Sequence, residues 1–336
     1  MRNMELTARW TGMGRVFSLL VLVANLAFSQ AYKIDLHTHI LPPFYLDWLT
    51  EQGYGLVNPP AWSPSLHLAY MESIGTATSV VSIAPPGVGP FNNSSSATTR
   101  AIARKLNQYS HDELAKAYPG KFQFWATVTL PDVEGSIAEA KYALEVLNAT
   151  GIFLESNKLG IYLGDPAFDS FFQFLNDVHA LVFIHPTNVP NVQALPGLAP
   201  NVLDFTLDIT RAAVNLVFTN TTQKYPNVTY ILANAGGSVT LLAYRAALSS
   251  RYSLPVMLEE LKKFYYDTTF SSTPSAMPTI LQFATPDRMT FGSDWPQGQD
   301  FGTPFYTQTI EEYPLDQSDR EKILRANAEG LFRRNS

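Results

Sequence analysis

Short apolar segments alternate with helix-like segments along most of the chain, and this alternation limits the possible folds more than any other feature. The apolar runs are continuous, which is typical of parallel strands that are buried on both faces. The predicted strands are Tyr32–Leu36, Ala77–Ile83, Phe122–Val128, Gly151–Leu154, Leu181–Ile184, Val228–Leu232, Phe264–Asp267 and Met289–Phe291.

Helical patterns lie between these strands, and the clearest are Ala97–Tyr118, Ile137–Leu147, Pro166–Val178 and Ser318–Phe332. Eight strands that alternate with helices over about 300 residues fit a (β/α)₈ barrel. An open doubly wound sheet is the alternative, but no G-x-G-x-x-G motif follows the first strand. The sequence therefore predicts the α/β class and a single TIM-type (β/α)₈ barrel domain over residues 32–336.

Residues 1–31 have the order of regions found in a secretory signal peptide. Three arginines precede an apolar run over residues 16–28, and the small residues Ser29 and Ala31 stand where a cleavage site requires them. The apolar run is short for a membrane span, and a helix packed on the domain is the alternative. We therefore expect entry into the secretory pathway and no stable membrane span after processing, with a cytoplasmic location as the alternative.

Five N-x-S/T sequons are compatible with glycosylation in the secretory pathway. They lie at Asn92, Asn93, Asn148, Asn220 and Asn227.

Charged side chains are scarce, and acidic ones are in excess. They make up 15% of the 336 residues, with 23 basic and 29 acidic side chains and a net charge of −6. Nucleic-acid binding requires a basic surface and is not expected. The absence of cysteine excludes disulfides, thiolate metal sites and cysteine nucleophiles, so any metal site must use histidines and carboxylates.

The strongest motif is Asp35-Leu36-His37-Thr38-His39, directly after the first predicted strand. Side chains two residues apart in a strand point to the same side. At the carboxyl end of a barrel strand that side is the interior mouth, where active sites lie. His37 and His39 are therefore a predicted pair of metal ligands.

Two further strands end in residues that bind metals. His185 follows Phe183-Ile184, and Asp294 follows the last predicted strand within Phe291-Gly292-Ser293-Asp294. Three imidazoles and one carboxylate suit Zn²⁺ or Mn²⁺, with coordination positions left open for water or substrate. We expect one divalent ion, most simply Zn²⁺, with Mn²⁺ as the alternative.

Taken together, the motifs I-D-L-H-T-H, F-I-H-P, L-A-N-A-G-G, F-G-S-D-W-P and N-A-E-G-L-F resemble the amidohydrolase-related family. They are most similar to the branch that contains aminocarboxymuconate-semialdehyde decarboxylase and the γ-resorcylate and 6-methylsalicylate decarboxylases. The resemblance implies a metal-dependent barrel enzyme, usually a homodimer, with His37, His39, His185 and Asp294 as ligands. Two-metal relatives carry a bridging lysine where this chain has Glu155, which favours one metal.

Further residues are candidates for contact with the substrate. Arg245 falls where relatives place an arginine that meets a substrate carboxylate, often across the dimer, and a surface salt bridge is the alternative. Trp295 is a candidate substrate contact, and with Phe44, Trp48 and Trp62 it could form an aromatic wall, although core packing is the default for each.

Asn234 departs from the pattern of the family, because relatives carry a histidine there as a general base. An asparagine can orient a ligand by hydrogen bonds but cannot accept a proton near neutral pH. This weakens a hydrolytic mechanism.

The expected activity is non-oxidative decarboxylation of a small aromatic carboxylic acid of the hydroxybenzoate or polyketide type. Asp294 would act as the acid and Asn234 as a hydrogen-bonding group. A metal-dependent hydrolase and a catalytically impaired family member are the alternatives.

The remaining candidates are weaker. The sequence favours a partly exposed helix position for His67, a solvated position for His111 and a loop position for His179. Asp267 ends the seventh strand, where it could orient a ligand or cap a helix.

Overall fold

The computed structural model describes residues 32–56, 58–89, 91, 94–189, 192–193, 195–249, 252–297 and 302–334. The predicted signal peptide at residues 1–31 and the sequons at Asn92 and Asn93 lie outside these ranges.

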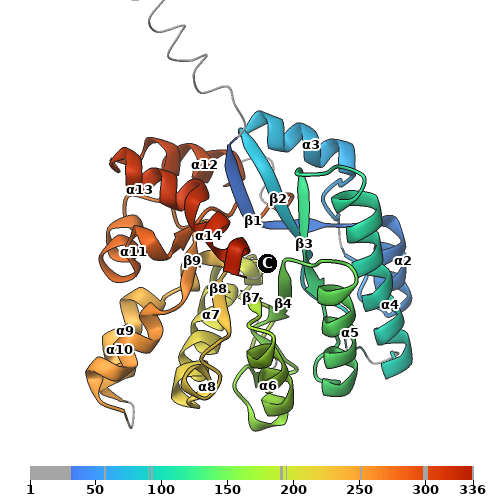
Figure 1. The fold of residues 1–336 in the computed structure, drawn as a ribbon, viewed down its shortest axis with the longest axis horizontal. Helices are drawn as coiled ribbons and strands as arrows, with labels where there is room; N and C mark the ends of the chain where they lie inside the picture. Colours follow the sequence, from blue (N-terminus) through green and yellow to red (C-terminus); the bar gives the residue numbers. More distant parts are fainter. Residues whose placement is uncertain are drawn as a thin grey trace, which may run out of the picture.

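The described residues form a parallel eight-stranded sheet in the order β1-β2-β3-β4-β7-β8-β9-β10. Chain order and spatial order agree, so the chain runs once around the sheet with helices on the outside (Figure 1). The strands are β1 Lys33–Ile40, β2 Thr76–Ile83, β3 Phe122–Thr127, β4 Gly151–Glu155, β7 Leu181–His185, β8 Thr229–Leu232, β9 Tyr265–Asp267 and β10 Met289–Thr290, and a small antiparallel hairpin joins β5 Asn157–Lys158 to β6 Ile161–Tyr162.

Backbone hydrogen bonds join the two edges of the sheet. Leu36 N donates to Phe291 O (3.0 Å), His39 N donates to Trp295 O (2.8 Å), and Asp294 N donates to His37 O (2.8 Å). The barrel is therefore closed by pairing between β1 and residues 291–295, which confirms the predicted (β/α)₈ architecture.

Helices cover the outside of the sheet. They are α2 Pro43–Glu51, α3 Pro64–Ser73, α4 Ser96–Tyr109, α5 Val133–Glu145, α6 Asp169–Asp177, α7 Pro200–Phe218, α8 Thr221–Lys224, α9 Val239–Leu248, α10 Leu254–Lys262, α11 Met277–Ala284, α12 Gly302–Glu312, α13 Gln317–Glu321 and α14 Asn327–Arg334. In the described ranges, no helix has the length and apolar character needed to cross a bilayer.

Two strands differ from the prediction in ways that matter for the site. β1 continues to Ile40 because β2 extends alongside it, so both histidines lie within the strand rather than after it. β10 is only two residues long, and Asp294 has a positive φ of 60°, which breaks the extended conformation. The chain therefore turns sharply at Asp294.

Large aromatic side chains fill the barrel interior. Trp125 stacks on Phe183 with ring centroids 5.6 Å apart, and its Nε1 donates to Leu36 O (2.8 Å). Phe183 in turn contacts the ring of His37 at 4.9 Å. This rigid layer supports the ends of the strands that carry the metal-binding motif.

Candidate metal centre

Three imidazoles from two strands converge in the mouth of the barrel. The ring centroids of His37, His39 and His185 lie 4.9–5.1 Å from one another, with interplanar angles of 80–87°. His37 and His39 come from the same face of β1, as the alternation predicts, and His185 is the last residue of β7.

The Nδ1 atom of each ring already has a partner. His37 Nδ1 donates to Asp267 Oδ2 (2.6 Å), and His185 Nδ1 donates to Pro186 O (2.7 Å). His39 Nδ1 lies 3.1 Å from both Ile83 O and Ser82 Oγ. Because a carbonyl or carboxylate accepts only from a protonated Nδ1, each ring in its neutral form carries its lone pair on Nε2. These are the tautomers that a metal ligand requires.

The fourth potential ligand is Asp294. One donor atom from each of the four residues lies within 4.8 Å of the others, and all four residues are buried. The three Nε2 atoms and Asp294 Oδ1 are buried and have no hydrogen-bond partner outside the cluster, in which Asp294 Oδ1 lies 2.8 Å from His39 Nε2 and 3.3 Å from His37 Nε2. Buried polar atoms that face only one another in this way are well suited to a shared cation, so the residues present fit one divalent ion.

The charges of the site perturb the pKa values of its members. Burial opposes ionisation of Asp294, but the charges and hydrogen bonds of His37 and His39 outweigh it and hold the pKa of Asp294 below its usual range. Burial alone would lower the pKa of His37, but Asp294 and Asp267 raise it to about 10. Burial lowers the pKa of His39 and of His185. The cluster therefore holds positive charge beside a carboxylate that is ionised.

Close packing around His37 leaves no room for side chains at one neighbouring position. A Cβ on Gly292 would lie 2.8 Å from His37 Cβ and 2.7 Å from Thr269 Oγ1.

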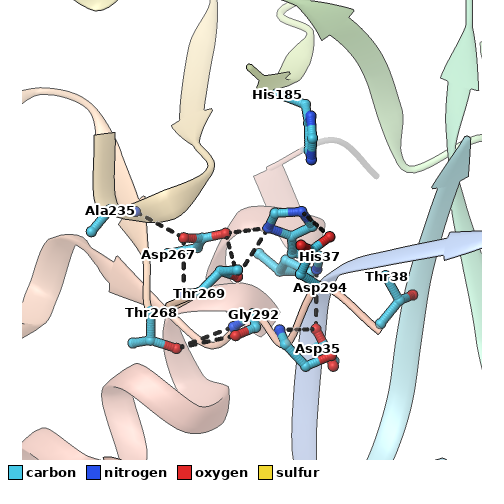
Figure 2. Close-up of polar contacts among 12 residues, drawn as sticks. Asp35, His37, Thr38, His185, Ala235, Asp267, Thr268, Thr269, Gly292 and Asp294 are labelled. Carbon is cyan, nitrogen blue, oxygen red and sulfur yellow. Dashed lines mark hydrogen bonds and ion pairs between the residues drawn. The ribbon is translucent and has the colours of Figure 1, made fainter. Parts of the chain in front are cut away.

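Asp35 holds the backbone on either side of the metal-binding residues. Its Oδ1 accepts from the backbone N atoms of His37 (3.1 Å) and Ser293 (3.2 Å). Burial raises the pKa of Asp35 to about 7. Figure 2 shows how these groups surround the imidazole.

A cavity of about 340 Å³ opens beside the metal ligands. Apolar side chains form part of its wall, and four carboxamide side chains supply polar groups. Its lining residues are His39, Leu56, Ala84, Pro85, His185, Asn188, Pro200, Asn201, Phe205, Asn234, Phe270, Asp294 and Gln297. An apolar cavity with a few polar groups beside a metal centre suits a small planar ligand.

Residues 34–334 match the amidohydrolase family. The chain belongs to this family. A decarboxylase named macB from Penicillium terrestre is 31% identical over 326 residues, which cover 90% of this chain and 95% of the relative. A 6-methylsalicylic acid decarboxylase from Penicillium expansum is 31% identical over 316 residues, which cover 90% of this chain and 96% of the relative.

A solved structure of similar fold is the 5-carboxyvanillate decarboxylase of Novosphingobium aromaticivorans with manganese and 4-hydroxy-3-methoxy-5-nitrobenzoic acid. It is 19% identical, its TM-score is 0.79, and the match covers 91% of this chain and 97% of that one. The barrel predicted for this family member is thus also the fold of a known aromatic acid decarboxylase.

The fold of this family member brings Asn234 to the cavity but not Arg245. Asn234 lines the cavity with His39, His185 and Asp294, and its Oδ1 is buried without a hydrogen-bond partner. Arg245 is exposed on α9, in a separate groove that it shares with Arg211 of α7. Within one chain Arg245 therefore does not line the cavity beside the metal ligands, and its contact with a substrate carboxylate stays a prediction.

The aromatic residues that the sequence put forward do not line the cavity. Trp295 stacks on Tyr70 at 5.0 Å and packs against His67 at 4.5 Å, so it is a core residue rather than a substrate contact. Trp295 is 4% exposed, whereas its neighbour Asp294 belongs to the metal group. Phe44, Trp48 and Trp62 are also absent from the lining. Phe205 of α7 and Phe270 after β9 take their place, and neither carries a motif that would reveal it.

The remaining histidines and acids have structural surroundings. The prediction for His67 is wrong, since it is fully buried between Trp62 Nε1 (3.3 Å) and Ser79 Oγ (3.0 Å). Glu155 pairs with Lys158 and lies outside the four-residue metal group, which agrees with a single ion.

Proposed function

We propose that the protein is a carboxy-lyase that decarboxylates a small aromatic acid of the hydroxybenzoate or polyketide type in a metal-dependent, non-oxidative reaction. The observation that carries this is the convergence of three imidazole Nε2 atoms and Asp294 Oδ1 beside a cavity with aromatic walls. The two relatives described above are decarboxylases according to their names, and the name of one gives 6-methylsalicylic acid as its substrate.

His37, His39, His185 and Asp294 would hold the ion. When bound, a divalent ion supplies Lewis-acid stabilisation for negative charge on the substrate oxygens. We propose Zn²⁺, which nitrogen-rich sites favour, and name Mn²⁺ as the second choice because the structural relative contains it.

The remaining residues would orient the ring and move a proton. Phe205 and Phe270 face the cavity and suit the flat faces of an aromatic ring. The unpaired Asn234 Oδ1 would accept a hydrogen bond from a ring hydroxyl. Asp294, ionised at rest, would take up a proton from solvent as the substrate binds and deliver it to the ring carbon that carries the carboxylate. The bond between that carbon and the carboxylate then breaks, carbon dioxide leaves, and the bonding electron pair restores the aromatic ring.

Hydrolysis is less well supported, because Asn234 cannot act as a base near neutral pH. Both relatives described at 31% identity are also decarboxylases by name.

The experiment is to load the protein with Zn²⁺ or Mn²⁺, incubate it with 6-methylsalicylate and other hydroxybenzoates, and follow loss of carbon dioxide by mass spectrometry. We expect turnover that a chelator stops and metal restores. The double variant His37→Ala, His39→Ala should lose both metal and turnover, while His111→Ala, at a half-buried histidine outside the metal group, should keep both. Full metal occupancy in the double variant would refute the site, and inactivity of the fully loaded wild type on every acid would refute the activity.

We also propose a homodimer formed through α7 and α9. Both helices expose large apolar side chains, and Leu241 and Leu248 of α9 are each 75% exposed. Exposed apolar residues gathered in this way are typical of an interaction surface. A second chain docked there is what could bring Arg245 to a substrate carboxylate in its partner.

For the compartment we propose the secretory pathway, on the strength of the basic, apolar and small regions of residues 1–31. Among the described sequons, Asn148 and Asn227 are exposed in loops that precede strands, on the face of the barrel opposite the metal centre. Glycans at these positions would leave the cavity open. An intact Met1 on protein from its native source would contradict the proposal.

A further inference from the structure

Asp267 is a fully buried carboxylate that contacts two parts of the metal centre at once. Its Oδ2 accepts from His37 Nδ1 (2.6 Å) and from Thr269 Oγ1 (2.9 Å). Its Oδ1 accepts from Ala235 N (3.0 Å) and from Thr269 N (3.1 Å). Figure 2 shows the carboxylate between the imidazole on one side and Ala235 on the other. Four donors fix the carboxylate in one orientation.

The segment that Ala235 belongs to is strained. Asn234, Ala235, Gly236 and Gly237 follow one another with φ values of 53°, 50°, 67° and 64°. The two glycines adopt this conformation readily, but it costs roughly 1–2 kcal/mol for each non-glycine residue. Such a turn persists only where its surroundings hold it. The bond from Ala235 N to Asp267 Oδ1 is one of the contacts that hold it.

The same turn directs Asn234 to the cavity. Asn234 precedes Ala235 directly, and it lines the cavity together with His39, His185 and Asp294. One oxygen of Asp267 therefore fixes a metal-binding imidazole, and the other fixes the backbone next to the residue that faces the substrate.

We propose that Asp267 is a positioning residue that couples the metal centre to Asn234. Through Oδ2 it selects the His37 tautomer with a free Nε2 lone pair, and through Oδ1 it holds the strained turn of Asn234. The role of Asp267 toward His37 does not depend on the proposed function, whereas its role toward Asn234 rests on that function.

An asparagine at position 267 cannot accept hydrogen bonds from both His37 Nδ1 and Ala235 N in the way that Asp267 does. Its amide has one acceptor oxygen, and its nitrogen only donates. If the oxygen stays with Ala235 N, the NH₂ group faces His37 Nδ1 and favours the tautomer with Nε2 protonated, which cannot bind a metal. If the oxygen turns to His37, the NH₂ group faces Ala235 N and the turn loses its acceptor. An aspartate-to-asparagine change that inverts a histidine tautomer in this way is known from serine proteases.

The experiment measures metal affinity, which does not depend on turnover. Binding of Zn²⁺ to the metal-free full chain is followed by competition with a chelator. We expect Asp267→Asn to raise the Kd about 10–100-fold, the range for loss of a partner of a ligating histidine. Glu139→Gln is the matched control, because Glu139 is a buried carboxylate bonded to Arg104 and Asn107 of α4. It should keep the wild-type Kd within threefold even if its melting temperature falls.

A second variant covers the case that Asp267→Asn does not fold. Thr269→Val keeps the side-chain volume and removes the hydroxyl that contacts both His37 Nδ1 (2.9 Å) and Asp267 Oδ2. We expect its Kd for Zn²⁺ to rise about fivefold, as for one lost hydrogen bond. The proposal would be overturned by a wild-type Kd for Zn²⁺ in Thr269→Val. It would also be overturned if the Kd of Asp267→Asn, like that of Glu139→Gln, stayed within threefold of the wild-type value.

The link to Asn234 is tested with salicylate as the probe on protein saturated with Zn²⁺. Asn234→Ala should weaken salicylate binding about tenfold in the wild type but less than threefold in the Asp267→Asn or Thr269→Val background. Equal losses in both backgrounds would show that the two groups are independent. If salicylate does not bind the wild type, the proposed function fails, and the Zn²⁺ measurements still decide the role of Asp267 toward His37.

Discussion

Asn234 occupies the position where the resemblance to the decarboxylase branch leads one to expect a general base. Its side chain faces the metal ligands across the cavity, and its Oδ1 has no partner within the protein. An amide in this place can bind and orient a substrate hydroxyl, but the transfer of a proton to substrate then falls to Asp294, the carboxylate among the described residues of the cavity wall.

Substitutions at these two positions should therefore have different effects. Asp294→Asn should abolish turnover, because it removes the proton carrier and a metal-binding charge together. Asn234→Ala should lower kcat/KM by the equivalent of about 1–3 kcal/mol for a lost buried hydrogen bond. Steady-state rates with 6-methylsalicylate test both.

Asn234→His restores the residue expected at this position and should leave activity equal or higher. A gain from an inactive wild type would identify the natural protein as catalytically impaired. Loss of a robust wild-type activity would mean that the asparagine has a role that hydrogen bonding alone does not explain.

His67 is a second residue whose surroundings define its protonation state. Trp62 Nε1 donates to its Nδ1, so a proton on Nδ1 would face another donor. Burial, with a smaller effect of the charge on His39, lowers the pKa of His67 to about 3. In the unfolded chain the pKa is 6.5, so the unfolded state binds the proton more readily. The contribution of neutral His67 to the free energy of unfolding is therefore complete above pH 6.5 and is lost as the pH falls toward 3.

We predict that the free energy of unfolding falls by about 2 kcal/mol between pH 6.5 and pH 5 through His67 alone. Urea unfolding at the two pH values measures the change, and His67→Gln should reduce it. An unchanged pH dependence in that variant would show that other groups are responsible.

At the scale of the elements, the residues that end strands could be predicted and the residues that line the cavity from helices and loops could not. His37 and His39 were predictable because a strand places every second side chain on one face. Phe205 and Phe270 reach the cavity from α7 and from a loop, and their positions depend on the path of the chain in three dimensions. His67 was misjudged because a short helix with apolar residues on most sides does not show which face is buried.

The segment after β10 contains Gly292, a glycine that is tightly packed against the metal centre. We predict that Gly292→Ala lowers the free energy of unfolding by about 1–3 kcal/mol and weakens metal binding, because the new Cβ would press on His37 and Asp267. Gly330→Ala is the control, since nothing lies within 4 Å of a Cβ there and an alanine should stabilise α14 by roughly 0.5–1 kcal/mol. Thermal unfolding and Zn²⁺ titration of both variants test the contrast.

At the scale of the whole molecule, the exposed apolar residues of α7 and α9 bear on assembly. We predict that the double variant Leu241→Asp, Leu248→Asp is monomeric while the wild type is dimeric, because buried carboxylates without partners disfavour the interface. Val146→Asp, on an exposed residue after α5, should remain dimeric. Sedimentation velocity distinguishes the species, and a monomeric wild type would refute the proposed interface.

The pairing of β1 with residues 291–295 also has a consequence for biosynthesis. Two metal ligands lie near the start of the barrel domain and Asp294 lies close to its end, so a ribosome must make nearly the whole domain before the four can meet. Emerging chains fold progressively, but the first strand stays an unpaired edge until the last segment arrives. The complete metal site therefore forms only after residue 294 has been made, and a prematurely terminated product would lack both the closed barrel and the complete set of metal ligands.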